Sequence, residues 1–253
     1  MVFNRKSPDL VEAAGDRIPV AARVSLRAEW RGMVRGYLQG ARAAGTGGVP
    51  RWPGMVAALV VGALYLLISD RYAVGPPWLV LVVAAALLTP LTLARLRGAH
   101  ELAHFLARAL NSVLTLAVAG SAALLLVRLV QGQTQALALL RDAALIWGAN
   151  ILTFALWYWS IDGGGPSHRH PGRHASTDFA FPQQQQAEAG VVEGWSPTFL
   201  DYLFVAFNTA TAFSPTDTMV LSRRMKLAMM CEASISLVVV AVLAARAINT
   251  IGI

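Results

Sequence analysis

The chain has 253 residues, of which 56% are hydrophobic and only 14% are charged, and its mean hydropathy is +0.53. Because soluble domains carry roughly 25% charged residues, this composition excludes an ordinary soluble domain and favours a chain that lies in lipid. The net charge of +7 predicts anionic lipid headgroups as partners and no nucleic acid, because the basic residues flank long apolar segments. The single cysteine, Cys231, excludes an internal disulfide and a metal site built from several cysteines.

Residues 1–50 predict a basic cytoplasmic tail that contains an amphipathic helix. Arginines recur there at every fourth residue, at Arg23, Arg27, Arg31 and Arg35. Apolar and aromatic residues lie on a neighbouring arc, so such a helix fits the surface of an anionic membrane. The alternative is a solvated helix or a partly disordered tail, which the glycines at 32, 36 and 40 favour.

Four apolar segments predict a four-span membrane domain in residues 51–161. Their expected ranges are about 55–69, 78–93, 110–130 and 136–161. The first is short for a crossing of about 20 residues unless Trp52 and Tyr72 lie in the two membrane interfaces. The fourth ends in an aromatic belt, Trp157 to Trp159, which is typical of an interface.

Residues 162–197 predict a polar connector that forms a surface loop. The connector holds a glycine triplet, a tract rich in histidine and arginine, and four consecutive glutamines that begin at Gln183. Histidine-rich tracts can bind metal, which makes His168, His170 and His174 an alternative metal site, but a flexible loop is the expected state.

Residues 198–253 predict a hairpin of one re-entrant helix and one final span. The apolar run 199–213 is too short to cross alone, whereas residues 227–248 are long enough. Basic residues accumulate on the cytoplasmic side of membrane proteins, and a re-entrant 199–213 leaves more of the 21 Lys and Arg residues inside than a full crossing does. The predicted fold is therefore all-α: a polytopic helical membrane protein with about five transmembrane helices, one re-entrant helix and a cytoplasmic N-terminus.

The hairpin resembles the pore half of two-span potassium channels. It shares with them a short amphipathic helix, a threonine-rich turn that ends in Asp217, a basic linker, and a long helix with Glu232 near its start. Thr209 and Thr211 match the threonines that precede the filter of these channels. The resemblance implies an ion channel that assembles as a homo-oligomer and conducts a monovalent cation.

The turn departs from the potassium filter signature TVGYGD at both glycines, because residues 212–217 read Ala-Phe-Ser-Pro-Thr-Asp. Glycine permits backbone conformations that Pro215, with φ fixed at about −65°, cannot adopt, so a ladder of filter carbonyls is not expected. Hydroxyl groups would replace the carbonyls, with several copies surrounding an axis. The pore-lining candidates are Thr209, Thr211, Ser214, Thr216 and Asp217. The alternative is a capped helix hairpin, in which Ser214 and Asp217 satisfy backbone donors.

A wider set of residues resembles bacterial inner-membrane proteins that share a domain of unknown function. Trp157-Tyr158, the loop 162–165 and Asp178-Phe179 carry this resemblance. It implies a location in the bacterial cytoplasmic membrane and no particular activity.

Two polar residues within the predicted spans are singled out by their chemistry. Glu232 is one turn into the last apolar run, and an acid inside a span is a functional candidate because burial of its charge is costly. Because Glu232 lies near the cytoplasmic end, within reach of Arg223 and Arg224, a structural ion pair with one of them is the expected state. Asn150, in the fourth span, is expected to form a hydrogen bond between helices.

The segment His100-Glu101-Leu102-Ala103-His104 matches the HExxH pattern of zinc metalloproteases. In that pattern two imidazoles one helical turn apart bind zinc, and the glutamate activates water. Zinc catalysis also needs a third protein ligand, and the downstream sequence offers none of the familiar motifs. A polar cytoplasmic turn before the third span is therefore the expected structure.

The sequence leaves three functional hypotheses in order. Ion permeation comes first, a non-enzymatic membrane scaffold or accessory protein comes second, and an HExxH protease comes last. No enzymatic activity, cofactor or bound metal is expected under the first two.

Overall fold

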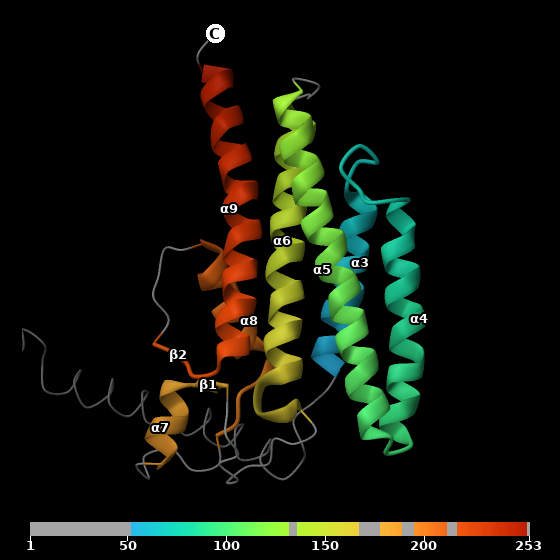
Figure 1. The fold of residues 1–253 in the computed structure, drawn as a ribbon, viewed down its shortest axis with the longest axis vertical. Helices are drawn as coiled ribbons and strands as arrows, with labels where there is room; N and C mark the ends of the chain where they lie inside the picture. Colours follow the sequence, from blue (N-terminus) through green and yellow to red (C-terminus); the bar gives the residue numbers. More distant parts are fainter. Residues whose placement is uncertain (1–51, 132–135, 167–177, 189–194, 212–216, 252–253) are drawn as a thin grey trace, which may run out of the picture. The chain divides into compact units, whose positions relative to one another are not determined.

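The computed structural model describes residues 52–131, 136–166, 178–188, 195–211 and 217–251 (Figure 1). All of them belong to one structural unit, Gly47–Ile253. The predicted amphipathic helix within residues 1–50, the three connector histidines, Ser214 and Thr216 lie outside the described residues.

Four helices form the first part of this unit. They are α3 (Trp52–Leu67), α4 (Pro77–Leu96), α5 (His100–Val130) and α6 (Ala136–Ile161). Proline at the first position of α4 begins a helix without loss of a hydrogen bond, because the N–H there has no partner inside the helix. After α4, the chain turns at Gly98, whose φ of 72° is a left-handed conformation that glycine adopts easily.

Four helices of the described chain are long and apolar enough to cross a membrane. These segments are Pro77–Leu96, His100–Val130, Leu137–Gly164 and Arg223–Arg246. Helix α3 is also apolar but has only 16 residues, which is short for an upright crossing of about 20 residues. The structure therefore has the helical architecture that an integral membrane protein requires.

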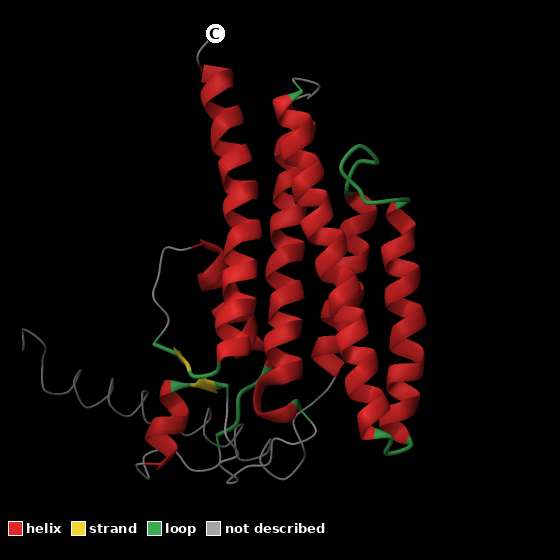
Figure 2. Cartoon of the chain, viewed as in Figure 1, coloured by secondary structure: helices red, strands yellow, loops and turns green. Residues whose placement is uncertain are grey.

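The second part of the unit is a set of short elements and one long helix. A 3-10 turn, η1 (Asp162–Gly164), follows α6 and leads to β1 (Phe179–Ala180) and α7 (Pro182–Glu188). They are followed by α8 (Phe199–Thr211), β2 (Met219–Val220) and α9 (Arg223–Ile251). The strands pair antiparallel, with Phe179 opposite Val220, and Figure 2 shows them beside the start of α9.

Helix α6 is central, because it packs against α3, α5, α8 and α9. Asn111 and Thr115 of α5 bond to Ser160 and Trp157 of α6, in reverse order along the two helices, so α5 runs antiparallel to α6. Glu232 and Ser236 of α9 bond to Tyr158 and Trp147 in the same reversed way, so α9 is also antiparallel to α6. The start of α8 lies at the end of α6, where Tyr202 bonds to Asp162. The start of α9 lies at that same end, because β2 pairs with β1 just after the α6 turn.

Helix α5 begins ten residues before the predicted third span. Residues 100–110 contain no proline or glycine, and Glu101 lies in the first turn, where a negative charge complements the helix dipole. The HExxH segment is therefore the first part of a helix, and the expected polar turn before the span is wrong.

Part of the connector differs from the predicted surface loop. Phe179 and Phe181 are buried at 0% and 3% exposure, and both rings contact Tyr202 of α8. Two phenylalanines two residues apart give this polar segment an apolar side that folds back onto α8. The glutamine run belongs to α7.

Helices α3 and α4 approach each other closely at Gly62. A Cβ atom added there would lie 2.9 Å from the Cα of Leu81, so no larger residue fits without a backbone shift. Tyr65, one turn later, is fully buried; its hydroxyl pairs with Ser121 of α5 at 2.8 Å and accepts the N–H of Val74 at 2.7 Å. Small residues and shared hydrogen bonds hold these helices together, as is usual for packing between membrane helices.

Candidate functional site

A buried stripe on α9 faces α6. Met225, Glu232, Ser236 and Val239 are each at most 1% exposed, and their spacings of seven, four and three residues place them on one side of the helix. Glu232 and Ser236 are the polar members. The carboxyl group of Glu232 is therefore buried, and the helix that carries it is long and apolar enough to cross a membrane.

Helix α6 supplies the partners of these polar groups. The hydroxyl of Tyr158, which is itself fully buried, donates to Oε2 of Glu232 at 2.5 Å. Nδ2 of Asn150 donates to the backbone carbonyl of Glu232 at 3.2 Å, and Nε1 of Trp147 donates to Oγ of Ser236 at 3.0 Å. Two helices that pack along their lengths thus share a line of hydrogen bonds.

Two buried oxygens of the described residues at this interface have no hydrogen-bond partner, Oε1 of Glu232 and Oδ1 of Asn150. Elsewhere on α6, Oγ1 of Thr153 and Oδ2 of Asp142 are also buried and unpaired. An unsatisfied buried polar group costs about 1–3 kcal/mol, and native structures contain few of them. These unpaired oxygens are therefore able to accept further hydrogen bonds or to bind a small cation.

Helix α8 packs against the polar residues that α6 and α9 share. Oγ of Ser236 donates to the carbonyl of Ala210 at 2.6 Å, and the ring of Phe207 packs edge-on against Trp147. The hydroxyl of Thr209 lies within hydrogen-bonding reach of the Tyr158 hydroxyl. Of the predicted pore-lining residues, Thr209 is the one placed beside Glu232.

The other predicted pore-lining residues lie apart from this cluster or outside the described chain. The hydroxyl of Thr211 donates to the carbonyl of Phe207 in its own helix, as threonines in helices often do. Asp217 is exposed, near β2. Ser214 and Thr216 lie outside the described residues, so the turn has no described geometry.

Two buried aspartates fix the hairpin to the end of α6. Asp162, fully buried, accepts the N–H groups of Asp178 and Phe179 and the hydroxyl of Tyr202. Asp178 receives Nε of Arg224 at 2.8 Å and a second bond from the same guanidinium. Burial alone would raise the pKa of Asp178, but hydrogen bonds from Arg224 and Ser222 outweigh it and hold that pKa below its ordinary value.

The expected ion pair of Glu232 with Arg223 or Arg224 is not formed. Arg224 pairs with Asp178, and Arg223 is exposed. Eight residues separate Arg224 from Glu232, which is roughly 12 Å along a helix, so one side chain cannot serve both acids. The side-chain partner of Glu232 is therefore Tyr158 and not an arginine.

The HExxH residues lie on the first turns of α5, with His100 and Glu101 exposed and His104 partly buried. Within the described ranges, no group of three or more His, Cys, Asp or Glu side chains is close enough to hold a metal ion. The third ligand that a zinc site needs is thus not supplied by any described residue.

Sequence reasoning missed Tyr158, Asp162 and Asp178 as members of the polar network. The sequence did contain a signal for Tyr158. Residues four apart in a helix lie on the same side, and Tyr158 is two such steps after Asn150, so both could be expected to face the same neighbouring helix. The aspartates carried no such signal, because their partners lie 16 to 46 residues away.

Comparison of the chain with protein-family models, with curated proteins and with solved structures finds no match. The interpretation of the site therefore depends on its own geometry. That geometry is a buried carboxyl group with one hydroxyl partner and an unpaired amide oxygen beside it, next to helix α8, whose start lies at the same end of α6 as strand β2.

Proposed function

We propose that the protein is an integral membrane protein that lets a small monovalent cation, the proton included, cross the bilayer beside Glu232. The observation that carries the proposal is the complete burial of Glu232 in a long apolar helix, with Oε1 unpaired. Acids in this position are expensive to maintain and mark ion paths and proton relays in membrane proteins.

In this proposal the side chains around Glu232 have separate tasks. The Tyr158 hydroxyl orients the carboxyl group, so that Oε1 is directed away from that hydrogen bond. Asn150 and Thr209 add neutral oxygens from two helices, which suits a cation that sheds part of its hydration shell.

The proposed topology has five spans, with α3 as the shortest, and α8 as a re-entrant helix. It is supported by the position of β2 beside β1, because the chain leaves α6 and begins α9 at the same end of the bundle. The α4–α5 turn and the start of α9 are rich in arginine and lysine, which favours a cytoplasmic location for this end and for the N-terminus in a bacterial inner membrane.

An alternative path follows the resemblance to potassium channels. Several copies would surround an axis lined by Thr209, Thr211, Ser214, Thr216 and Asp217. The exposure of Asp217 and the partial exposure of Thr211 are compatible with this arrangement. It differs from the path beside Glu232 in the residues on which conduction depends.

Ion flux into proteoliposomes tests the proposal. Vesicles that contain the purified protein, a cation gradient and a pH-sensitive dye should show flux above that of protein-free vesicles. Glu232→Gln should reduce this flux roughly tenfold or more, because it removes the ionisable group from the span. Glu101→Gln is the matched control, since Glu101 is exposed at the start of α5.

Flux equal in wild type and Glu232→Gln would contradict the path beside Glu232. A loss confined to Thr211→Val and Asp217→Asn would assign conduction to the axial arrangement instead. No flux of protons, sodium or potassium through the wild-type protein would remove the permeation proposal as a whole.

A membrane scaffold is the second candidate. The observation that favours it is the firm attachment of the hairpin: Asp162 and Asp178 bind both α8 and α9 to the end of α6. A scaffold needs this rigidity and no permeant ion. Wild-type protein that folds, assembles and shows no flux would favour this second candidate.

A further inference from the structure

Glu232 is buried without a positive charge beside it. Its side chain is fully buried, and its side-chain partner is the hydroxyl of Tyr158, a neutral group that donates to Oε2. Burial of an ionised carboxylate without a compensating cation costs far more than burial of a neutral acid, so such a group takes up a proton instead. The described surroundings of Glu232 therefore suit a neutral carboxyl group.

The described charged groups on the helices around Glu232 do not supply a cation. On α6, Asp142 pairs with Arg141 and precedes Tyr158 by sixteen residues, which is roughly 24 Å along a helix. On α8, Asp201 accepts the N–H and the hydroxyl of Thr198 at the start of the helix. The other titratable side chains of α5, α9 and the end of α6 are exposed, lie near a helix end or bond elsewhere: His100, Glu101, His104, Arg108, Arg128, Asp162, Arg223, Arg224, Lys226, Cys231 and Arg246.

Two unpaired acceptors remain at this interface within the described chain. They are Oε1 of Glu232 and Oδ1 of Asn150, and Nδ2 of Asn150 holds its amide next to Glu232 by donating to the Glu232 carbonyl. A proton on Oε1 turns one of these acceptors into a donor, for which the amide oxygen is an acceptor. The ionised carboxylate offers no donor, so the charged state leaves both oxygens unsatisfied.

We propose that Glu232 holds a proton on Oε1, and that the proton is the cation that its site takes up and releases. Uptake forms the Oε1–H bond and release breaks it, with water at the membrane surface as the source and the final acceptor of the proton. The second part rests on the proposed function, because it names which monovalent cation permeates.

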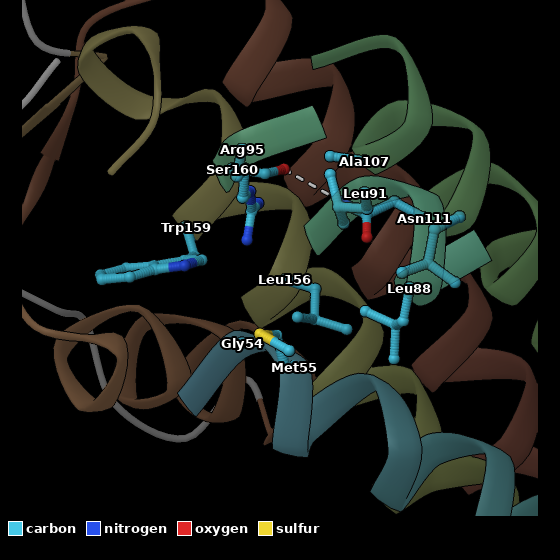
Figure 3. Close-up of a pocket in the computed structure, with 11 residues that line it drawn as sticks. Gly54, Met55, Leu88, Leu91, Arg95, Ala107, Asn111, Leu156, Trp159 and Ser160 are labelled. Carbon is cyan, nitrogen blue, oxygen red and sulfur yellow. Dashed lines mark hydrogen bonds between the residues drawn. The ribbon is translucent and has the colours of Figure 1, made fainter. Parts of the chain in front are cut away.

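A sodium or potassium ion fits these surroundings less well. Such an ion needs several oxygen ligands in place of its hydration shell, whereas Met225 and Val239 pack on the same side of α9 as Glu232 and are fully buried. A cavity of about 30 Å³ lies elsewhere, among α3, α4, α5 and α6; its lining includes Leu156 and Ser160 but no residue of α8 or α9 (Figure 3). That cavity gives a hydrated cation no space beside Glu232.

Infrared difference spectroscopy of the full chain in detergent tests whether Glu232 holds a proton. A protonated carboxylic acid has a C=O stretching band that is separate from the carboxylate bands and moves to lower frequency in D2O. At neutral pH, the spectrum of wild type minus that of Glu232→Gln should contain this band. The matched control is Glu101→Gln, whose difference spectrum should lack the band because Glu101 is exposed to water.

Two further variants test the hydrogen bonds of the protonated acid. Tyr158→Phe removes the donor to Oε2, which is the carbonyl oxygen when the proton is on Oε1, so the band should move to higher frequency. Asn150→Leu removes the acceptor of the acid proton and should move the band in the same direction. Trp147→Phe is the control at the same interface, because it removes the bond to Ser236 and should leave the band in place.

Two infrared results would overturn the proposal. One is a wild-type spectrum identical to that of Glu232→Gln in the carboxylic acid region. The other is a band that neither Tyr158→Phe nor Asn150→Leu moves.

Ion flux into proteoliposomes distinguishes this inference from the proposed function. Proton flux that Glu232→Gln abolishes, with sodium and potassium flux equal to that of protein-free vesicles, is the expected result. Sodium or potassium flux that Glu232→Gln abolishes would overturn the assignment of the proton and leave the path beside Glu232 in place. The acid band together with no flux of any ion would remove the path and support the proton on Glu232.

Discussion

Four buried acids of the described chain contact tyrosine or arginine, and they differ in how completely they are paired: Asp142, Asp162, Asp178 and Glu232. Asp162 and Asp178 each accept several hydrogen bonds where the chain turns after α6. Asp142 pairs with its neighbour Arg141, and its second oxygen is unpaired. Glu232, about a third of the way along α9, has Tyr158 as its side-chain partner and one unpaired oxygen. Asp162 and Asp178 therefore serve structure, and Glu232 is the buried acid of the described chain that has no cationic partner.

Asp178 should make the stability of the protein depend on pH. Asp178→Asn should lower the free energy of unfolding by about 1.5–3 kcal/mol at neutral pH, because the charged bond to Arg224 is lost. Its pKa lies below the ordinary value in the folded state, so this contribution is complete above the unfolded pKa of about 3.9 and is lost as pH falls through the folded pKa. Unfolding titrations in mixed micelles at several pH values measure the difference.

The difference between wild type and Asp178→Asn should thus be constant near neutral pH and shrink in acid. Asp70→Asn serves as the control, since Asp70 is exposed and should affect stability little at any pH. A difference that persists unchanged well below the folded pKa would show that the Arg224 bond is not its cause.

Single polar residues inside apolar runs were the part of the site that the sequence could predict. Glu232 and Asn150 stand out because an acid or an amide is unusual in a span. Their partners could not be predicted, because the meeting of Tyr158 with Glu232 depends on the rotation and register of two helices 74 residues apart. The same holds for Asp178 and Arg224, which are separated by 46 residues.

At the scale of elements, the apolar runs predicted the helices well and their starts less well. The run 199–213 was expected to be short, and α8 has 13 residues. The start of α5 was missed because helix formation does not stop where hydropathy falls. The folding of the connector was missed because it depends on contacts of Phe179 and Phe181 with Tyr202 of α8.

The contact of α3 with α4 should be sensitive to one methyl group. Gly62→Ala should destabilise the protein by about 1–3 kcal/mol, because the new Cβ would lie 2.9 Å from the Leu81 backbone. Gly148→Ala is the control: nothing lies within 4 Å of a Cβ there, so alanine should be neutral or stabilising by up to about 1 kcal/mol. Thermal unfolding in detergent compares them, and equal effects would contradict the close approach.

The hairpin should place the start of α9 on the same side of the membrane as the α4–α5 turn. In a Cys231→Ala background, Leu221→Cys and Arg97→Cys should react with an impermeant maleimide only after the cells are permeabilised. Asp70→Cys, at the opposite end of α3, should react in intact cells. All three positions are exposed. Reaction of Leu221→Cys from outside would mean that α8 crosses the membrane.

At the scale of the whole molecule, the axial arrangement requires more than one chain, because one re-entrant helix cannot enclose a path. Leu200, Phe204 and Phe207 are exposed on α8, at 69%, 58% and 47%, and this apolar face is available to a second copy. We therefore expect a homo-oligomer in mild detergent, measured by light scattering with the detergent mass subtracted. A stable monomer that still conducts would leave only the path within a single chain, beside Glu232.

The pairing of β1 with β2 joins two segments that the ribosome makes about forty residues apart. Until Met219 and Val220 emerge and α9 follows, Tyr158 and Asn150 on α6 have no α9 partner and would face acyl chains. A nascent chain that stops before this point would carry polar side chains on the outside of its membrane domain. The carboxyl site is thus buried only once α9 has been made and packs against α6.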